Sequence, residues 1–73
     1  MITDQELATN YMENYSTCRD GGMNHYESHR HALNVMNVYL DANEVPKAVA
    51  NRLKASAMRI IDAKKDSGEF IVD

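Results

Sequence analysis

The segment Gly21-Gly22-Met23-Asn24-His25-Tyr26-Glu27 combines an end signal for one helix with a start signal for the next. Glycine readily adopts the left-handed conformation in which helices commonly end, so the Gly21-Gly22 pair predicts a helix end. The Asn24 side chain can accept a hydrogen bond from the backbone of Glu27, and Glu27 can bond back, which is the capping-box pattern of a helix start. The segment therefore predicts two helices joined by a short turn.

Matching signals mark the other helix boundaries. Thr3 and Glu6 form a second capping box at the beginning of the chain, and Ile2 can reach Leu7 as the hydrophobic staple that accompanies it. Pro46 suits the first turn of a third helix, because a backbone N–H at that position would have no acceptor within the helix, and proline lacks this N–H.

Gly68 marks the end of the third helix. We therefore expect helices over about 4–19, 24–42 and 46–66, followed by a short extended C-terminal tail. Short connections make sequential helices antiparallel neighbours. The prediction is a small antiparallel three-helix arrangement of the all-α class, forming a single helical domain over residues 1–73.

The composition is that of an ordinary globular protein, with 44% hydrophobic and 26% charged residues and a net charge of −3. A single cysteine, Cys18, excludes an intrachain disulfide. The first residues lack the basic start and apolar core of a signal peptide, and no stretch is long enough to span a membrane. These features predict a cytoplasmic location and no membrane partner.

The second and third helices each carry two apolar stripes, where a surface helix needs one. The expected core stripes comprise Tyr26, His29, Leu33, Met36 and Leu40 in one helix, and Val49, Leu53, Ala57, Ile60 and Ile61 in the other. The additional stripes comprise His31, Val35, Val38 and Ala42, and Ala48, Asn51, Ala55 and Met58. Small residues in the last set would let another helix approach closely.

Two interpretations of the additional stripes remain open. In the first, the second helix lies centrally, so both of its stripes are internal. This does not account for the additional stripe of the third helix, although its alanines could reflect helix propensity alone, without any contact. Otherwise another chain covers the stripes, which predicts a homodimer or a bound protein partner. The partner-binding residues are then His31, Val35, Val38, Ala48, Asn51, Ala55 and Met58. Replacing Ala55 with arginine should disrupt such an association.

Three histidines lie close together in the sequence. His25 and His29 are one helical turn apart, so their imidazoles could chelate one ion, but zinc normally needs three or four protein ligands. The ordinary expectation is that His29 packs at the core edge while His25 and His31 face solvent. We expect no cofactor, and keep a metal site at His25 and His29 as an alternative.

The third helix holds six of the eight basic residues. Helical projection places Lys47, Lys54 and Lys65 on one flank of its core stripe and Arg52 and Arg59 on the other. Such flanks usually cover apolar surface with long side chains. A nucleic-acid or anionic-ligand site built from Lys47, Arg52, Lys54 and Arg59 remains the alternative.

Nothing in the sequence indicates catalysis. Cys18 falls near a helix C-terminus, where the helix dipole disfavours a thiolate, and no glycine-rich phosphate loop or catalytic carboxylate pair is present. In general profile the chain resembles small helical phage and mobile-element proteins, anti-CRISPR proteins among them, that occlude a host machine. The sequence thus predicts a non-enzymatic interaction protein that docks a helical face on a larger macromolecule and blocks or adapts it.

Overall fold

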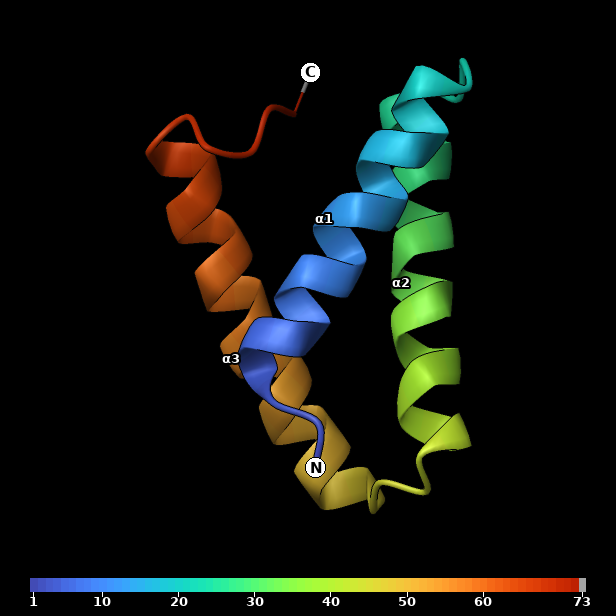
Figure 1. Cartoon of the computed structure of the whole chain (residues 1–73), viewed down its shortest axis with the longest axis vertical. Helices are drawn as coiled ribbons and strands as arrows, with labels where there is room; N and C mark the ends of the chain where they lie inside the picture. The colour runs from blue at the N-terminus through green and yellow to red at the C-terminus, as the bar shows by residue number, and fades with distance from the viewer. Residues whose placement is uncertain (73) are drawn as a thin grey trace.

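The computed structural model describes residues 1–72 and, within them, contains three α-helices and no strand (Figure 1). They are α1 (Asp4–Asp20), α2 (His25–Ala42) and α3 (Lys47–Asp66). The predicted all-α class is confirmed, and every predicted helix boundary lies within one residue of the observed one. None of these helices combines the length and apolarity that crossing a membrane would require.

Side-chain caps begin α1 and α2 as predicted. The Thr3 hydroxyl accepts a hydrogen bond from the Glu6 N–H at 3.1 Å, and the Glu6 carboxylate accepts one from the Thr3 N–H at 3.0 Å. The reciprocal bonds between Asn24 and Glu27 measure 2.8 and 3.4 Å. Helix α3 differs, because Pro46 lies just before its first turn rather than in it and provides no side-chain cap.

All three helices end in the same backbone motif. In each, a residue with positive φ allows the next N–H to bond back to a carbonyl five residues earlier, as in a Schellman motif. The bonds are Met23 to Cys18, Val45 to Leu40 and Glu69 to Lys64. The positive-φ residues are Gly22, Glu44 and Gly68. The sequence predicted that helices end at both glycines, but it gave no signal for the positive φ of Glu44.

Helix α1 is the central helix of the molecule. It packs against both α2 and α3, whereas α2 and α3 contact each other only slightly, so α1 lies between two diverging helices (Figure 1). Ser28 and Ala32, both fully buried, provide the small side chains with which α2 approaches α1. The interpretation that placed the second helix centrally is therefore wrong, because the first helix has this position.

The observed core is narrower than the predicted stripes. Tyr26, expected in the core, is 64% exposed, because the buried side of α2 runs through Ser28, Ala32, Met36 and Leu40 instead. On α3 only Ala57 and Ile61 are buried. The remaining members of its predicted stripe, Val49, Leu53 and Ile60, are half-buried. They stay partly open because α3 packs on one helix only.

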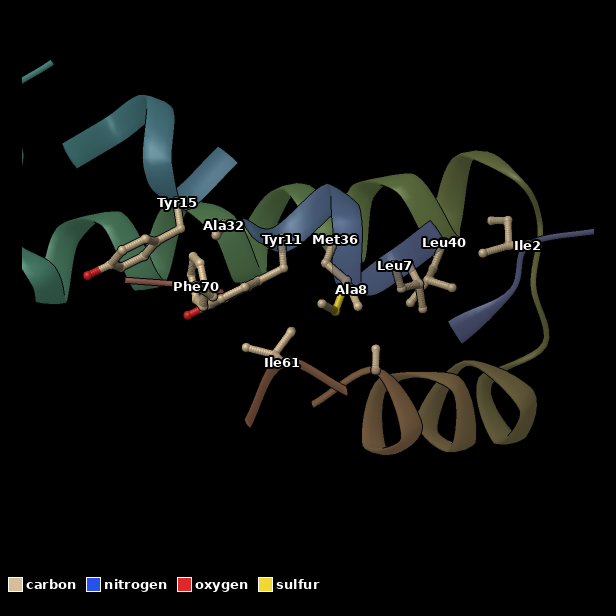
Figure 2. Close-up of a cluster of buried hydrophobic side chains, with 11 residues drawn as sticks. Ile2, Leu7, Ala8, Tyr11, Tyr15, Ala32, Met36, Leu40, Ile61 and Phe70 are labelled. Carbon is tan, nitrogen blue, oxygen red and sulfur yellow. The ribbon is translucent and has the colours of Figure 1, made fainter. Parts of the chain in front are cut away.

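The C-terminal tail turns back onto the core. After Gly68 the chain runs toward α1, and Phe70 is buried at 6% exposure (Figure 1). Its ring meets those of Tyr11 and Tyr15 edge to face, with centroids 6.1 and 5.3 Å away (Figure 2). The tail thus closes the end of the core at which α1 and α3 diverge.

Candidate functional site

A hollow of about 740 Å³ opens where the start of α1, the end of α2 and the start of α3 meet. Its apolar lining includes Ile2, Val45, Val49 and Leu53. A second hollow, of about 370 Å³, shares Val49 and Leu53 and continues between α1 and α3. Together we call these hollows the α1–α3 seam, defined by Ile2, Asp4, Glu6, Glu44, Val45, Val49, Arg52, Leu53, Ser56 and Arg59.

Charged side chains flank the apolar middle of the α1–α3 seam in an ordered way. Glu6 and Glu44 line the first hollow, whereas Arg52 and Arg59 line the second. The second hollow also contains Asp4, whose carboxylate accepts a hydrogen bond from the Ser56 hydroxyl at 2.7 Å, which joins the start of α1 to α3. The seam is therefore apolar at its centre, with two carboxylates on one side, and with two guanidinium groups and the hydrogen-bonded Asp4 carboxylate on the other.

Few residues of α2 line the seam. Tyr39 of α2 and Asn43, just after its end, line the first hollow, but neither residue lines the second. Leu53 packs against the core with one side, and both Val49 and Leu53 border the hollows. The uncovered apolar surface thus lies at the inner edge of α3.

The predicted partner-binding residues have mixed positions. On α2, His31 and Val38 are exposed, with Val38 at 65%, and Val35 is half-buried. On α3, the exposed members of the stripe are Ala48, Asn51 and Ala55. Met58 departs from the prediction, because it is partly buried and packs against the core instead of lying on the outer face.

The two predicted stripes do not form one surface. A 3.1 Å hydrogen bond from the Lys54 ammonium to the side-chain amide oxygen Oδ1 of Asn37 marks the sides on which α3 and α2 face each other. At roughly 100° per residue, His31 and Val35 lie about 120° and 160° around α2 from Asn37. The α2 stripe therefore points away from α3, and a single partner face cannot include both stripes.

The basic residues of α3 are distributed over several environments. Arg52 and Arg59 line the seam, Lys54 bonds to α2, and Lys47 is exposed at the start of the helix. Farther along, Lys64 pairs with Glu69 at 3.7 Å and Lys65 with Asp62 at 3.4 Å. Arg52 and Arg59 thus share one hollow whereas Lys54 faces α2, so the four cations of the predicted anion site do not line one hollow.

The histidines of α2 are held by the tyrosines of α1. The Tyr15 hydroxyl bonds to Nδ1 of His25 at 2.8 Å, and the Tyr11 hydroxyl bonds to Nδ1 of His29 at 2.6 Å. The imidazole rings stack with centroids 6.0 Å apart and planes 16° apart. His25 and His31 are exposed and His29 is half-buried, as expected. The sequence did not indicate the tyrosine bonds.

Burial raises the pKa of Tyr11 above the ordinary value of 10.0, and the neighbouring Tyr15 and Asp62 raise it further. At neutral pH the group is therefore a protonated phenol. Its hydroxyl can donate a hydrogen bond to an imidazole nitrogen or accept one from it, depending on which nitrogen of the ring holds the proton.

Cys18 is buried at 8% exposure at the end of α1, in keeping with a small apolar role. Over residues 1–72, no three or more His, Cys, Asp or Glu side chains gather so as to hold a metal ion. Within one chain, a metal bound at His25 and His29 would therefore have two side-chain ligands of these types.

Sequence reasoning assigned Val49 and Leu53 wholly to the core and left Val45 out of any site. The structure brings all three to the first hollow. One signal was present: Val45-Pro46 places two apolar residues in a turn that is otherwise polar. Whether α2 would cover the start of α3 depends on how the helices diverge, which no local pattern records.

The sequence matches no protein-family model, and comparison with curated proteins and with solved structures gives no significant match. The function is therefore argued from the geometry of the chain itself. That geometry presents a concave apolar seam between charges of opposite sign, which is suited to docking a macromolecular surface.

Proposed function

We propose that the chain is a non-enzymatic interaction protein that forms a homodimer through the α1–α3 seam. The dimer would present its remaining helical faces to a larger macromolecule, which it blocks or adapts, in the manner of the small phage proteins whose general profile it resembles. The observation that supports this proposal is the half-buried apolar surface of Val49 and Leu53, which lines both hollows.

The charges of the seam suit a second copy of the same chain. In a twofold-symmetric dimer the same patch contacts itself in reversed orientation, so the acidic side of one copy meets the basic side of the other. Glu6 and Glu44 would then face Arg52 and Arg59 of the second copy. Such complementarity favours one orientation and speeds association.

The area required is compatible with the size of the chain. A standard interface buries about 800 Å² on each partner. The whole chain exposes 4828 Å², so such an interface would occupy about a sixth of its surface. At about 25 cal/mol per Å², a few hundred Å² of apolar surface supply several kcal/mol before the costs of association.

The proposal is tested by measuring the mass of the purified chain by sedimentation equilibrium over a range of concentrations. We expect a dimer with twice the 8.3 kDa chain mass. Val49→Gln removes apolar surface from the seam and replaces valine with a better helix former, so it should weaken dimerisation at least tenfold without disrupting α3. Circular dichroism verifies that the variant remains helical.

Ala55→Arg provides the matched control on the exposed outer face of the same helix. A dimer formed through the seam should stay intact, because Ala55 does not line either hollow, whereas the outer-stripe contact expected from the sequence predicts dissociation. Dissociation by Ala55→Arg together with an unaffected Val49→Gln dimer would contradict the seam and assign the contact to the outer stripe. A wild-type chain that stays monomeric at high concentration would contradict the homodimer itself. Added salt should weaken the seam dimer, because its flanking charges are exposed.

A further inference from the structure

Tyr26, expected in the core, instead belongs to an open strip along α2. At roughly 100° per residue, Tyr26, Arg30, Leu33 and Asn37 fall within about 60° of the helix circumference and span about 16 Å of its length. Tyr26, Arg30 and Asn37 are exposed, and Leu33 is half-buried. The Lys54 side chain of α3 joins them through its hydrogen bond to Asn37. We call these five residues the α2 strip.

The α2 strip contains the residue types that dominate protein interfaces. The Arg30 guanidinium lies over the Tyr26 ring, with its central carbon 5.6 Å from the ring centroid, which is a cation–π contact. Tyrosine and arginine are enriched among the residues that contribute most to binding energy. Because each of these two side chains already restrains the other, they lose less conformational freedom when a partner binds.

The charges of the α2 strip indicate the chemistry of its partner. Arg30 and Lys54 are its charged members, and within residues 1–72 neither forms an ion pair. Asp41, the next carboxylate along this side of α2, lies one turn beyond Asn37, where the strip ends. Arg30 and Asn37, which holds the Lys54 ammonium, are two turns or about 10 Å apart along the helix axis. Carboxylates seven residues apart on another helix have the same spacing.

We propose that the α2 strip docks an acidic amphipathic helix of a protein partner. Two carboxylates seven residues apart on that helix meet Arg30 and Lys54, and an apolar side chain between them packs on Tyr26 and Leu33. With two cations in the strip and a net charge of −3 on the chain, a pair of protein carboxylates fits better than the continuous charge of a nucleic acid.

This inference rests on the proposed interaction function, for which it names the kind of partner, but not on the dimer. No member of the α2 strip except Leu33's neighbours in space is needed for the seam, since none of the five lines either hollow. Tyr39, the α2 residue that does line the seam, lies about 160° around the helix from Asn37.

The test uses an alanine-rich peptide of about 20 residues, long enough to form a helix, with two glutamates seven residues apart and a leucine between them. Fluorescence anisotropy of the labelled peptide measures its affinity for the purified chain. Arg30→Glu should weaken binding at least tenfold, whereas Lys47→Glu, at an exposed cation of α3 outside the strip, should change it less than twofold. Absence of binding to the wild-type chain, or an equal loss in both variants, would overturn the strip.

A second peptide of the same composition separates spacing from charge. Its glutamates are five residues apart and therefore on different sides of the helix, so it should bind at least fivefold more weakly. Equal affinity for the two peptides would overturn the paired contact. Single-stranded oligothymidylate provides a nucleic-acid arm. Tighter binding of this oligonucleotide than of the first peptide, lost in Arg30→Glu, would assign the strip to nucleic acid instead.

Nitrogen-15 spectra of the wild-type chain locate the bound peptide without any variant. The peptide should shift the backbone amides from Tyr26 to Asn37 and the Asn37 side-chain amide, and leave those of Val49 and Leu53 in place. Shifts centred on Val49 and Leu53 would place the peptide in the α1–α3 seam and overturn the strip.

Sedimentation of the same proteins separates this proposal from the dimer. Arg30→Glu should remain dimeric, and Val49→Gln should keep the wild-type affinity for the peptide. A monomeric wild-type chain that binds the peptide would contradict the dimer and support the strip. A dimer that does not bind the peptide would contradict the strip and leave the dimer supported.

Discussion

Glu44 is the one described non-glycine residue with a positive φ, at 53°. In the motif that ends α2, Glu44 occupies the position that Gly22 occupies after α1 and Gly68 occupies after α3. An L-residue in the left-handed region loses roughly 1–2 kcal/mol through the crowding of its Cβ. The turn into α3 therefore includes a local strain that glycine would relieve.

We expect Glu44→Gly to raise the free energy of unfolding by about 0.5–1 kcal/mol, because relief of the Cβ crowding exceeds the added flexibility of the unfolded chain. Urea denaturation followed by circular dichroism measures the change. Glu44→Ala is the matched control, since alanine removes the charge but retains the Cβ. An equal gain in both variants would assign the effect to the charge of Glu44.

At the scale of elements, the tail contributes to the core although it has no regular structure. Phe70 packs edge to face on two buried tyrosines (Figure 2). The Glu69 backbone N–H donates a hydrogen bond to the Lys64 carbonyl at 3.0 Å. The next residue, Ile71, is 69% exposed. Two adjacent apolar residues thus have opposite environments, which makes a direct comparison possible.

Phe70→Ala should destabilise the fold by about 3 kcal/mol, near the lower end for a buried phenylalanine, because a tail can partly close the space left behind. Ile71→Ala should change the free energy of unfolding by less than about 0.5 kcal/mol, since its side chain is exposed. Thermal and urea unfolding provide the comparison. Similar losses in the two variants would show that the tail does not dock through Phe70.

For the whole molecule, the main feature is the unequal support of the helices. Helix α1 packs on two neighbours, whereas α3 packs mainly on α1 and leaves Val49, Leu53 and Ile60 half-buried. Regions with few buried apolar contacts open at lower free energy than the core. We therefore expect two parts of the molecule to unfold separately. One is α3 with part of the tail, and the other is the α1–α2 pair.

Native-state hydrogen exchange by NMR tests this expectation at low protein concentration, where the proposed dimer dissociates. The central amides of α1 and α2 should exchange with the free energy of global unfolding, and those of α3 with a lower value. A uniform protection across all three helices would show one cooperative unit. At high concentration, dimerisation through the seam should raise the protection of α3.

The local signals in the sequence determined the helices. The capping boxes at Thr3 and Asn24 and the glycines at 22 and 68 act over a few residues, so the chain itself records them. Together with Pro46 they located these boundaries to within one residue, whereas α2 ends at Ala42 with Glu44, not a glycine, in its end motif.

Only the tertiary structure decided which helix is central and which surface stays open. Helical periodicity identifies apolar stripes, but the depth to which each is buried depends on the angles between helices. Tyr26 satisfied the spacing of a core stripe and is exposed, whereas Met58 was assigned to an outer stripe and packs on the core. The pairing of Tyr11 with His29 joins residues 18 apart in the sequence, and the docking of α1 on α2 brings them together.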